Sequence, residues 1–384
     1  MSINEKIYLD YNATTPVDQR VVDEMMPFFT NVFGNPNSDH AYGWEADEAV
    51  ELAREEIADL LNCNPTEIIF TSGATEAANL AINGFCKKHK SEGNHIITCK
   101  TEHKAVLDTI ANLENEGFDV TYLEVDNEGM IDLDELEKSI TSETIFVCLM
   151  MANNETGVIY PMEKIRDIVH SKGAKLMSDL TQAIGKIPID LQELNPDIAV
   201  FSSHKIYGPK GVGALFINKQ NKINIEPHLY GGGQEYGLRP GTLNVPGIVG
   251  FSKAIDISLS CLDEEYNRLI SLRSYLEKLL LQIDGSKINS GSSERLPNTI
   301  NISFSNISGV DLLRKLNMLA LSRGSACSAN TIKPSHVLKA MGLSDELALA
   351  SIRISLGRNT TIGEIELAAA EISKAVNQLK ATAV

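Results

Sequence analysis

The stretch "AKLMSDLTQAIGKIPIDLQELNPDIAVFSSHK", residues 174–205, holds two short apolar runs separated by a more polar segment. Both runs, AKLMSDL and DIAVFSS, are apolar over several consecutive positions, which is typical of strands buried on both faces of a sheet. The first ends at Asp179 and the second leads into Ser202, His204 and Lys205. Open α/β sheets place their ligands at the carboxyl ends of their strands, so these polar groups are candidates for one common site.

The same alternation of strand and helix continues on both sides of this stretch. The further strand-like runs are EIIFTS, NHIITCK, DVTYLEV and TIFVCLMM, and the helical patterns include ATEAANLAINGF, TEHKAVLDTIANLENEG and MEKIRDIVHSKG. This order predicts an α/β domain with a mostly parallel sheet, covered by helices on both faces and extending to about residue 255. A long helical segment, residues 253–283, and the shorter strands NTINISF and SIRISLG then predict a smaller α+β domain.

Composition excludes some classes of partner. The chain has 384 residues, 34 basic and 51 acidic, which gives a net charge of −17. Such a balance argues against a general surface for nucleic acid or anionic membrane. No apolar run approaches the ~18 residues of a membrane span, and the start MSINEKIYLDY lacks the pattern of a signal peptide. We therefore expect a cytoplasmic protein with neither membrane nor direct nucleic-acid contacts.

One of the six cysteines stands apart from the others. Five fall in or beside apolar segments, where a thiol usually packs as a small hydrophobe; they are Cys63, Cys86, Cys99, Cys148 and Cys261. No CxxC pair and no paired His/Cys spacing occurs, so we expect no resident metal site. Cys327, by contrast, lies in SRGSACSANTIKPS, residues 322–335, among small, turn-forming residues that cannot bury it.

Three features of the large domain point to one cofactor. In TSGATEAANL a strand ends at Thr71 and a helix begins near Thr75, which would present backbone amides to a phosphate, although Ser and Thr also cap many helices without a ligand. Asp179 can cap a helix or pair with a protonated ring nitrogen. Lys205, at the end of a buried strand, would have a lowered pKa and act as a nucleophilic amine. No GxGxxG or GxxxxGK motif supports a nucleotide. Together the three features predict pyridoxal phosphate.

At this point the chain also resembles a known family. The motifs YLDYNATTPVD, FGNPNS, FTSGATEAANLA, TEHKAVLDT, NNETGV, SSHKIYGPKGVGAL, RPGTLNV, GSACS and SIRISLGR occur in this order. They resemble the IscS/NifS family of cysteine desulfurases, which belongs to the class V aminotransferase-like enzymes. The resemblance implies the fold-type I architecture of pyridoxal-phosphate enzymes and a homodimer. It implies a large domain with a seven-stranded sheet, residues 14–255, and a small domain, residues 1–13 and 256–384, that carries the Cys327 loop.

The resemblance also implies roles for individual residues. Lys205 would bind the cofactor covalently, Asp179 would pair with its ring nitrogen, and His103 would stack on the ring and assist proton transfer. Arg353 and Asn154 would bind the substrate, and Cys327 would be the catalytic thiol. The remaining cofactor contacts would come from Ala74, Thr75, Ser202 and His204 at the phosphate, Asn154 and Gln182 at the phenolic oxygen, and Thr242 reaching in from the other subunit. Without the motifs, His103 would be read as a helix cap or packing residue, and Arg353 as a solvated partner in a salt bridge.

The reaction implied is the conversion of L-cysteine to L-alanine with transfer of sulfur to Cys327 as a persulfide. An acceptor protein would then receive the sulfur for iron–sulfur cluster assembly, tRNA thiolation or DNA phosphorothioation, and Cys327 could transiently ligate a nascent cluster. The alternatives on the same fold are a selenocysteine lyase and an aminotransferase, although transamination needs no loop thiol. Leu180, Tyr236 and Arg323 depart from the residues common in the family.

Overall fold

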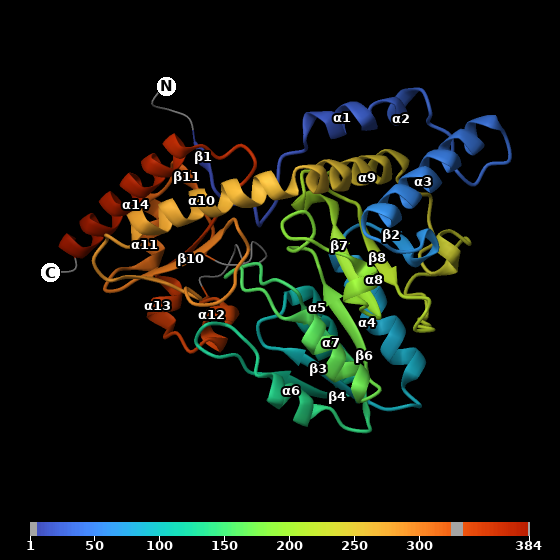
Figure 1. Ribbon diagram of the computed structural model, residues 1–384, viewed down its shortest axis with the longest axis horizontal. Coiled ribbons are helices and arrows are strands. Elements are labelled where there is room, and N and C mark those ends of the chain that lie inside the picture. The colour runs from blue at the N-terminus through green and yellow to red at the C-terminus, as the bar shows by residue number, and fades with distance from the viewer. Residues whose placement is uncertain (1–5, 324–332, 383–384) are drawn as a thin grey trace.

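The computed structural model describes residues 6–323 and 333–382, which form two bodies side by side (Figure 1). The larger body is built on a seven-stranded sheet in the order β2-β8-β7-β6-β5-β3-β4. Its strands are β2 Ile68–Thr71, β3 His95–Cys99, β4 Asp119–Leu123, β5 Thr144–Met150, β6 Lys175–Asp179, β7 Ile198–Ser202 and β8 Gly213–Ile217. β8 runs antiparallel to both of its neighbours, and the other paired strands are parallel. The predicted mostly parallel sheet is therefore confirmed. The sequence patterns indicated six of its strands and missed β8.

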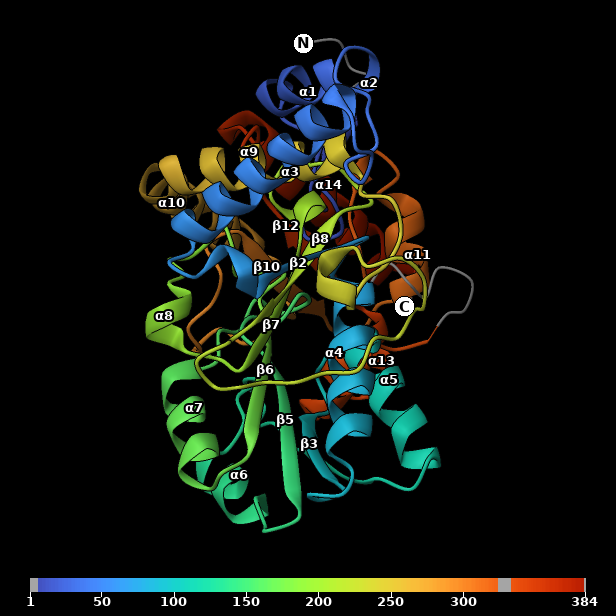
Figure 2. The same ribbon diagram turned by 90° about the vertical axis from the view of Figure 1, so that its right-hand side faces the viewer.

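Helices cover both faces of this sheet, as its continuous apolar strands require. Every residue of β5 and β7 is buried, and successive side chains point to opposite faces. Thus Phe201 belongs to the core cluster that includes residues of α3 Ala41–Leu60, α7 Met162–Ser171 and α9 Val245–Ser260, while Val200 belongs to the cluster that includes residues of α4 Ala74–His89 and α5 Lys104–Asn115. Figure 2 places α7 and α4 on opposite sides of the sheet. The other helices of this body are α1 Gln19–Met25, α2 Pro27–Thr30, α6 Leu133–Ser139 and α8 Leu191–Leu194, with short 3-10 turns at η1 Pro65–Glu67, η2 Ser203–Lys205 and η3 Glu235–Gly237.

The smaller body has its own sheet and core. Its antiparallel sheet has the order β12-β10-β9, formed by β9 Ser286–Ile288, β10 Thr299–Phe304 and β12 Ser351–Ser355, and a second, parallel pair joins β1 Ile7–Tyr8 to β11 Leu319–Ala320. The helices are α10 Leu262–Leu280, α11 Gly309–Lys315, α12 His336–Ala340, α13 Asp345–Leu349 and α14 Ile362–Thr382. Leu9 packs in the core of this body with Leu276, Ile302 and Ile372. Leu9 of the N-terminal arm therefore contributes to the core of the smaller body.

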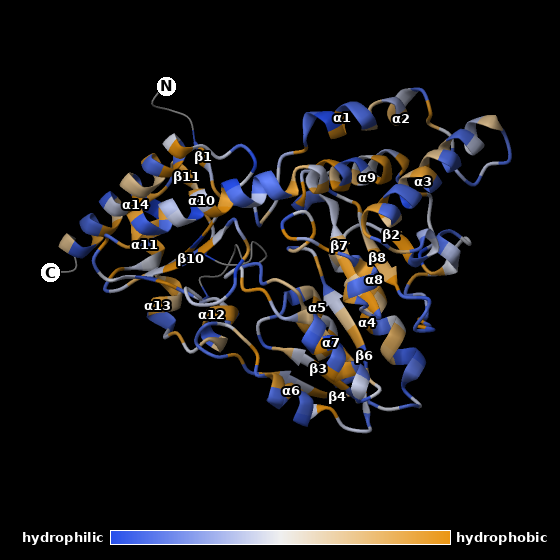
Figure 3. Cartoon of the chain, viewed as in Figure 1, coloured by the Kyte–Doolittle hydropathy of each residue, from blue (hydrophilic) through white to orange (hydrophobic). Residues whose placement is uncertain are grey.

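The long helical segment predicted over residues 253–283 consists of two helices. α9 ends at Ser260 and α10 begins at Leu262, with a bend of 69° between them. α9 packs against α1 and α3 of the large body, whereas α10 packs against α14. Figure 3 colours α9 as apolar along most of its length and gives α10 and α14 mixed polar and apolar residues. A straight helix could not bury both apolar surfaces, because they face different cores.

Within residues 6–323 and 333–382, no single helix is long and apolar enough to cross a membrane, and only α9 and α10 taken together across their bend pass that test of length and composition.

Candidate active site

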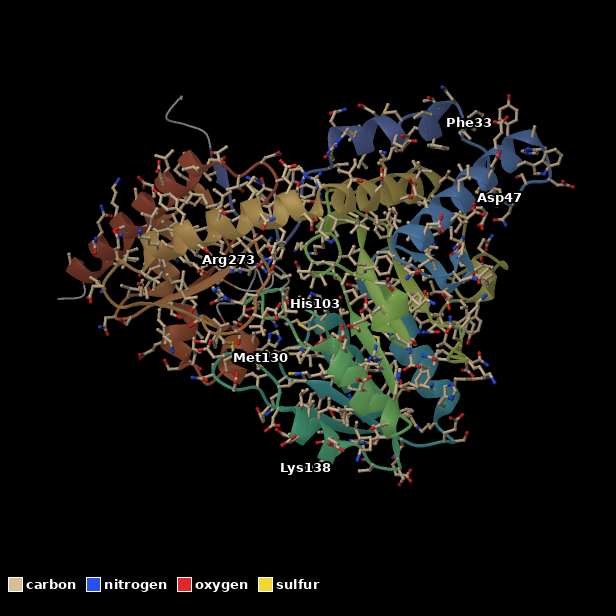
Figure 4. All side chains as sticks on the ribbon, viewed as in Figure 1. Phe33, Asp47, His103, Met130, Lys138 and Arg273 are labelled. Atoms are coloured by element: carbon tan, nitrogen blue, oxygen red, sulfur yellow. The ribbon has the colours of Figure 1, made fainter. Side chains whose placement is uncertain are left out.

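The carboxyl ends of the large-body strands surround a cavity of about 440 Å³. Residues just after β2, β3, β5, β6 and β7 line it, and Arg353 of β12 and the arm residues Asn12, Ala13 and Thr14 complete the wall. Ten predicted site residues line this one cavity: Ala74, Thr75, His103, Asn154, Asp179, Gln182, Ser202, His204, Lys205 and Arg353. Figure 4 shows His103 in the middle of the molecule, where the two bodies meet. Thr242 is exposed and is not among the lining residues, and Cys327 lies outside the described residues.

The start of α4 forms one end of the cavity. Its N-cap is Gly73, with φ of 150°, and no side chain caps the helix. The Ser or Thr cap considered as the alternative is therefore not present, and among the described residues no side chain caps the amides of this first turn. The backbone is packed so closely here that a Cβ on Gly213 would lie 2.6 Å from the Phe201 oxygen and 2.7 Å from the Gly73 Cα. A helix N-terminus of this kind is suited to a phosphate.

His204 lies beside this helix start. Its Nδ1 is 3.1 Å from the Thr14 hydroxyl. Burial lowers its pKa to about 4, and the charges of Lys205 and Lys210 add to this effect. The ring is therefore neutral at physiological pH and can offer a hydrogen bond rather than a charge.

Lys205 lies in the short turn η2 directly after β7. Its Nζ donates to the backbone oxygens of Asn12 at 2.8 Å and Ala13 at 2.7 Å. Sequence reasoning assigned no role to Asn12 or Ala13, because a turn that follows a two-residue strand carries no periodic signal. The motif YLDYNATTPVD, in which they lie, was the available clue.

Asp179 and His103 each have a structural role at the cavity wall. Asp179 ends β6, and its Oδ1 accepts from the Thr181 amide at 2.8 Å. His103 is the N-cap of α5, since its Nδ1 accepts from the Ala105 amide at 3.1 Å. Burial lowers the pKa of His103, and Asp179 opposes that shift. With Nδ1 occupied as an acceptor, the neutral ring carries its proton on Nε2.

Arg353 is 1% exposed, so the solvated salt bridge considered for it was wrong. One terminal nitrogen donates to Asp10 Oδ1 at 2.7 Å and the other to the Asn154 backbone oxygen at 2.9 Å. The Arg353 side chain of this ion pair is thus buried, and the pair joins Asp10 of the N-terminal arm to β12. Because a guanidinium has five N–H donors, these two bonds leave others for a ligand.

Comparison with known proteins identifies the family. The aminotransferase class-V family profile matches residues 7–367. The cysteine desulfurase IscS of Pectobacterium carotovorum is 48% identical over 377 residues, which are 97% of this chain and 93% of that protein. The chain is a cysteine desulfurase-type member of the class-V aminotransferase family.

Solved structures of this family agree with the fold. A NifS-like protein superposes with a TM-score of 0.92 at 41% identity, over 97% of this chain and 100% of that one. SspA, solved in complex with cysteine, superposes with a TM-score of 0.81 at 37% identity, over 91% of this chain and 98% of that one. The fold-type I expectation is therefore confirmed.

The departures from the family pattern lie in different surroundings. Leu180 is fully buried in the core below β6, and its amide donates to the Val200 oxygen at 2.9 Å. Tyr236 is 54% exposed, with a φ of 55°, and the Arg54 guanidinium lies 5.6 Å from its ring. Arg323 is half-buried at the edge of the described residues. Leu180 therefore affects packing beneath the cavity, whereas Tyr236 affects an outer surface.

Proposed function

We propose that this cysteine desulfurase family member uses pyridoxal phosphate to convert L-cysteine to L-alanine and passes the sulfur to Cys327 as a persulfide. The observation that supports this best is the convergence of Lys205, Asp179, His103 and Arg353 on one cavity at the N-terminus of α4. The cavity volume, about 440 Å³, lies in the range of small-molecule sites. Among the described residues, no group of three or more His, Cys, Asp or Glu side chains could hold a metal.

The lining residues fit the cofactor chemically. The uncapped start of α4, with Ala74 and Thr75, would hold the phosphate together with the Ser202 hydroxyl and the neutral His204 ring. Asp179 would pair with the ring nitrogen, Asn154 and Gln182 would contact the phenolic oxygen, and Lys205 would form the covalent link. When bound, pyridoxal phosphate withdraws electrons from the substrate Cα and so makes its proton acidic.

The chain's own groups would perform the remaining steps. Arg353 would bind the substrate carboxylate with the donors that Asp10 and Asn154 do not use, and its planar fork suits that shape. The Lys205 amine, released when the substrate amine replaces it in the covalent link, would take the Cα proton, and His103 would exchange a proton at Nε2. The Cys327 thiolate would then attack the substrate sulfur. The bond from sulfur to Cβ breaks, a sulfur–sulfur bond forms on Cys327, and protons at Cβ and Cα complete alanine.

We also propose a homodimer in which Thr242 reaches the partner's cavity. Thr242 is exposed in the single chain. Exposed large apolar side chains gather on and beside α1, α2 and α3, the region of Phe33 in Figure 4: Met26, Phe29, Phe33, Tyr42, Trp44 and Leu52. A concentration of apolar surface of this kind is typical of a protein interface.

The sulfur carried by Cys327 would pass to another protein. An acceptor protein for iron–sulfur assembly or thiolation would receive it from Cys327, and we propose that this occurs in the cytoplasm. The five cysteines among the described residues are all unpaired, which is usual in a reducing compartment.

The test is to incubate the purified, cofactor-loaded protein with L-cysteine and to measure alanine and protein-bound persulfide. Lys205→Ala should lose both products together with the visible absorption of the bound cofactor. Cys327→Ala should lose the persulfide, whereas Cys261→Ala, at another unpaired cysteine, should keep it. Persulfide formation that is undiminished in Cys327→Ala would refute the assignment, and a strong preference for L-selenocysteine would favour the lyase.

A further inference from the structure

A second lysine lies behind the cavity wall and has no role in the proposed reaction. Lys186 is buried and follows Gln182 by four residues in the turns after β6. Its Nζ donates to Asn12 Oδ1 at 3.2 Å and, in a short contact, to Gln182 Oε1. In the part of the chain that the structure describes, no carboxylate bonds to this amine.

A buried amine without a carboxylate is unusual, because lysine is rarely buried unless it is paired. Burial lowers the pKa of Lys186 well below its ordinary value, and the charges of Lys205 and Arg353 lower it further. The amine does not need its charge for the contacts it makes, since a neutral amine has two N–H groups for the two carbonyl oxygens. Lys186 therefore acts here as a hydrogen-bond donor rather than as an ion-pair partner.

The two acceptors of Lys186 are both connected to Lys205. Gln182 Nε2 donates to the Asn12 backbone oxygen at 3.0 Å, and Lys205 Nζ donates to the same oxygen at 2.8 Å. Because Lys186 holds Gln182 Oε1, the amide nitrogen is the atom turned toward Asn12. A flipped amide would bring two carbonyl oxygens together and would leave the Lys186 amine facing an N–H group.

Asn12 is fixed by the same set of contacts. Its Oδ1 also accepts from Asn298 at 3.1 Å, and its Nδ2 donates to the Thr299 hydroxyl at 2.8 Å. Its backbone oxygen is thereby held where both Lys205 and Gln182 use it.

We propose that Lys186 is a positioning residue, which fixes the Gln182 amide and the Asn12 carbonyl and through them the place of the Lys205 amine. This inference rests on the proposed function in one respect, that Gln182 and Lys205 contact the cofactor.

The experiment compares Lys186→Met with Lys175→Met, which removes a half-exposed lysine at the start of β6 whose partner is Asp197. Each refolded apoprotein is titrated with pyridoxal phosphate, and the absorption maximum of the loaded protein is recorded. Losing donors to two buried oxygens should weaken cofactor affinity roughly tenfold or more in Lys186→Met and should shift the maximum. Lys175→Met should match the wild type in both measurements.

A double-mutant cycle shows whether Lys186 acts through Gln182. Gln182→Met and Lys186→Met should have strongly non-additive effects on cofactor affinity, since the two residues share one contact. Lys186→Gln, which keeps N–H donors, should recover part of the affinity, and it also serves if the methionine variant does not fold. Wild-type affinity in Lys186→Met, or additive effects in the cycle, would overturn the inference. Failure of the wild-type protein to bind pyridoxal phosphate would instead refute the proposed function.

Discussion

At the scale of the residue, His103 caps α5 in the structure and would also take part in proton transfer in the proposed function. Its Nδ1 caps α5, and its other face borders the cavity. A cap and a catalytic group were competing interpretations of the sequence, but the geometry lets one side chain serve as both. Substitutions that differ in capping ability can therefore separate the two tasks.

We expect His103→Asn to keep the cap and lose the chemistry, because asparagine is among the best N-cap residues but has no titratable ring. Alanine production should fall about 10²-fold or more, as is usual when a proton-transfer group is removed. The thermal midpoint of the apoprotein should stay near that of the wild type. His103→Ala should lose the same activity and also about 1 kcal/mol of stability. Equal stability losses in both variants, or full activity in His103→Asn, would contradict this account.

His204 gives a prediction about acid stability. Its pKa is about 4 in the folded chain against an ordinary 6.5, so the unfolded chain binds more protons between these values. The contribution of the neutral His204 ring to the free energy of unfolding is complete above pH 6.5 and is lost as the pH falls toward 4. Between about pH 7 and about pH 5 the apoprotein should lose about 2 kcal/mol through this residue.

Urea unfolding of the apoprotein at the two pH values checks this. His204→Gln should reduce the loss of stability, and His228→Gln, at an exposed histidine, should leave it unchanged. An unchanged pH dependence in His204→Gln would mean that the ring is solvated or differently paired in solution.

At the same scale, the sequence predicted which residues would lie together at the cavity. Asp179, Ser202, His204 and Lys205 were predicted to meet because each ends or directly follows a strand, and parallel strands end at one edge of the sheet. The sequence analysis assigned no role to Asn12 or Lys186. Their contacts join residues that lie 170 or more positions apart in the sequence, and hydrophobic periodicity reports only on neighbouring positions.

At the scale of the element, the position of β8 explains why the backbone is so closely packed at the turn before α4. β8 pairs antiparallel with β2 and β7, and its first residue, Gly213, lies against Gly73. The six other strands were predicted from apolar runs, but GALFI follows a glycine-rich turn and has no helix before it. Periodicity alone could not reveal an antiparallel strand inserted between two parallel ones.

Gly213→Ala should disturb the start of α4. Its Cβ would lie within 2.7 Å of backbone atoms on both sides, and backbone cannot rotate away as a side chain can. We expect a loss of about 1–3 kcal/mol in unfolding free energy, together with weaker binding of pyridoxal phosphate. Gly363→Ala, in α14 where nothing lies within 4 Å of the added Cβ, is the control and should reduce neither the stability nor the cofactor affinity. Denaturant unfolding and cofactor titration measure the two effects, and unimpaired binding in Gly213→Ala would show that the turn tolerates displacement.

The division into domains also belongs to this scale. The boundary between the large and the small domain, placed at residues 255 and 256 from the sequence, stays a prediction. We now propose that the boundary lies near Cys261. α9 crosses the earlier limit and packs with the large body, whereas α10 packs with the small one. The sequence did not reveal the break between α9 and α10, because the helical pattern of apolar and polar residues continues across it.

At the scale of the whole molecule, the apolar surface around α1 to α3 is the interface of the proposed dimer. Phe33 and Trp44 are 64% and 60% exposed in the single chain, although both are large apolar residues. Arg239, three residues before Thr242, is bonded at 2.7 Å to Glu76 in the first turn of α4. The loop that would reach the partner is therefore tied to the helix that would hold this subunit's phosphate.

We expect the wild-type protein to be a dimer in solution, and Phe33→Asp to weaken the association about tenfold or more, since a central aromatic contact often dominates an interface. Light scattering after gel filtration measures the mass directly. Trp44 is the only tryptophan in the chain, so its fluorescence in the apoprotein should shift to longer wavelength as Phe33→Asp exposes it. Leu367→Asp, at a residue 51% exposed on α14, should leave both measurements unchanged. If Thr242 completes the partner's phosphate site, the monomeric variant should also bind pyridoxal phosphate more weakly. A monomeric wild-type protein with full cofactor affinity would remove both the dimer and the role of Thr242.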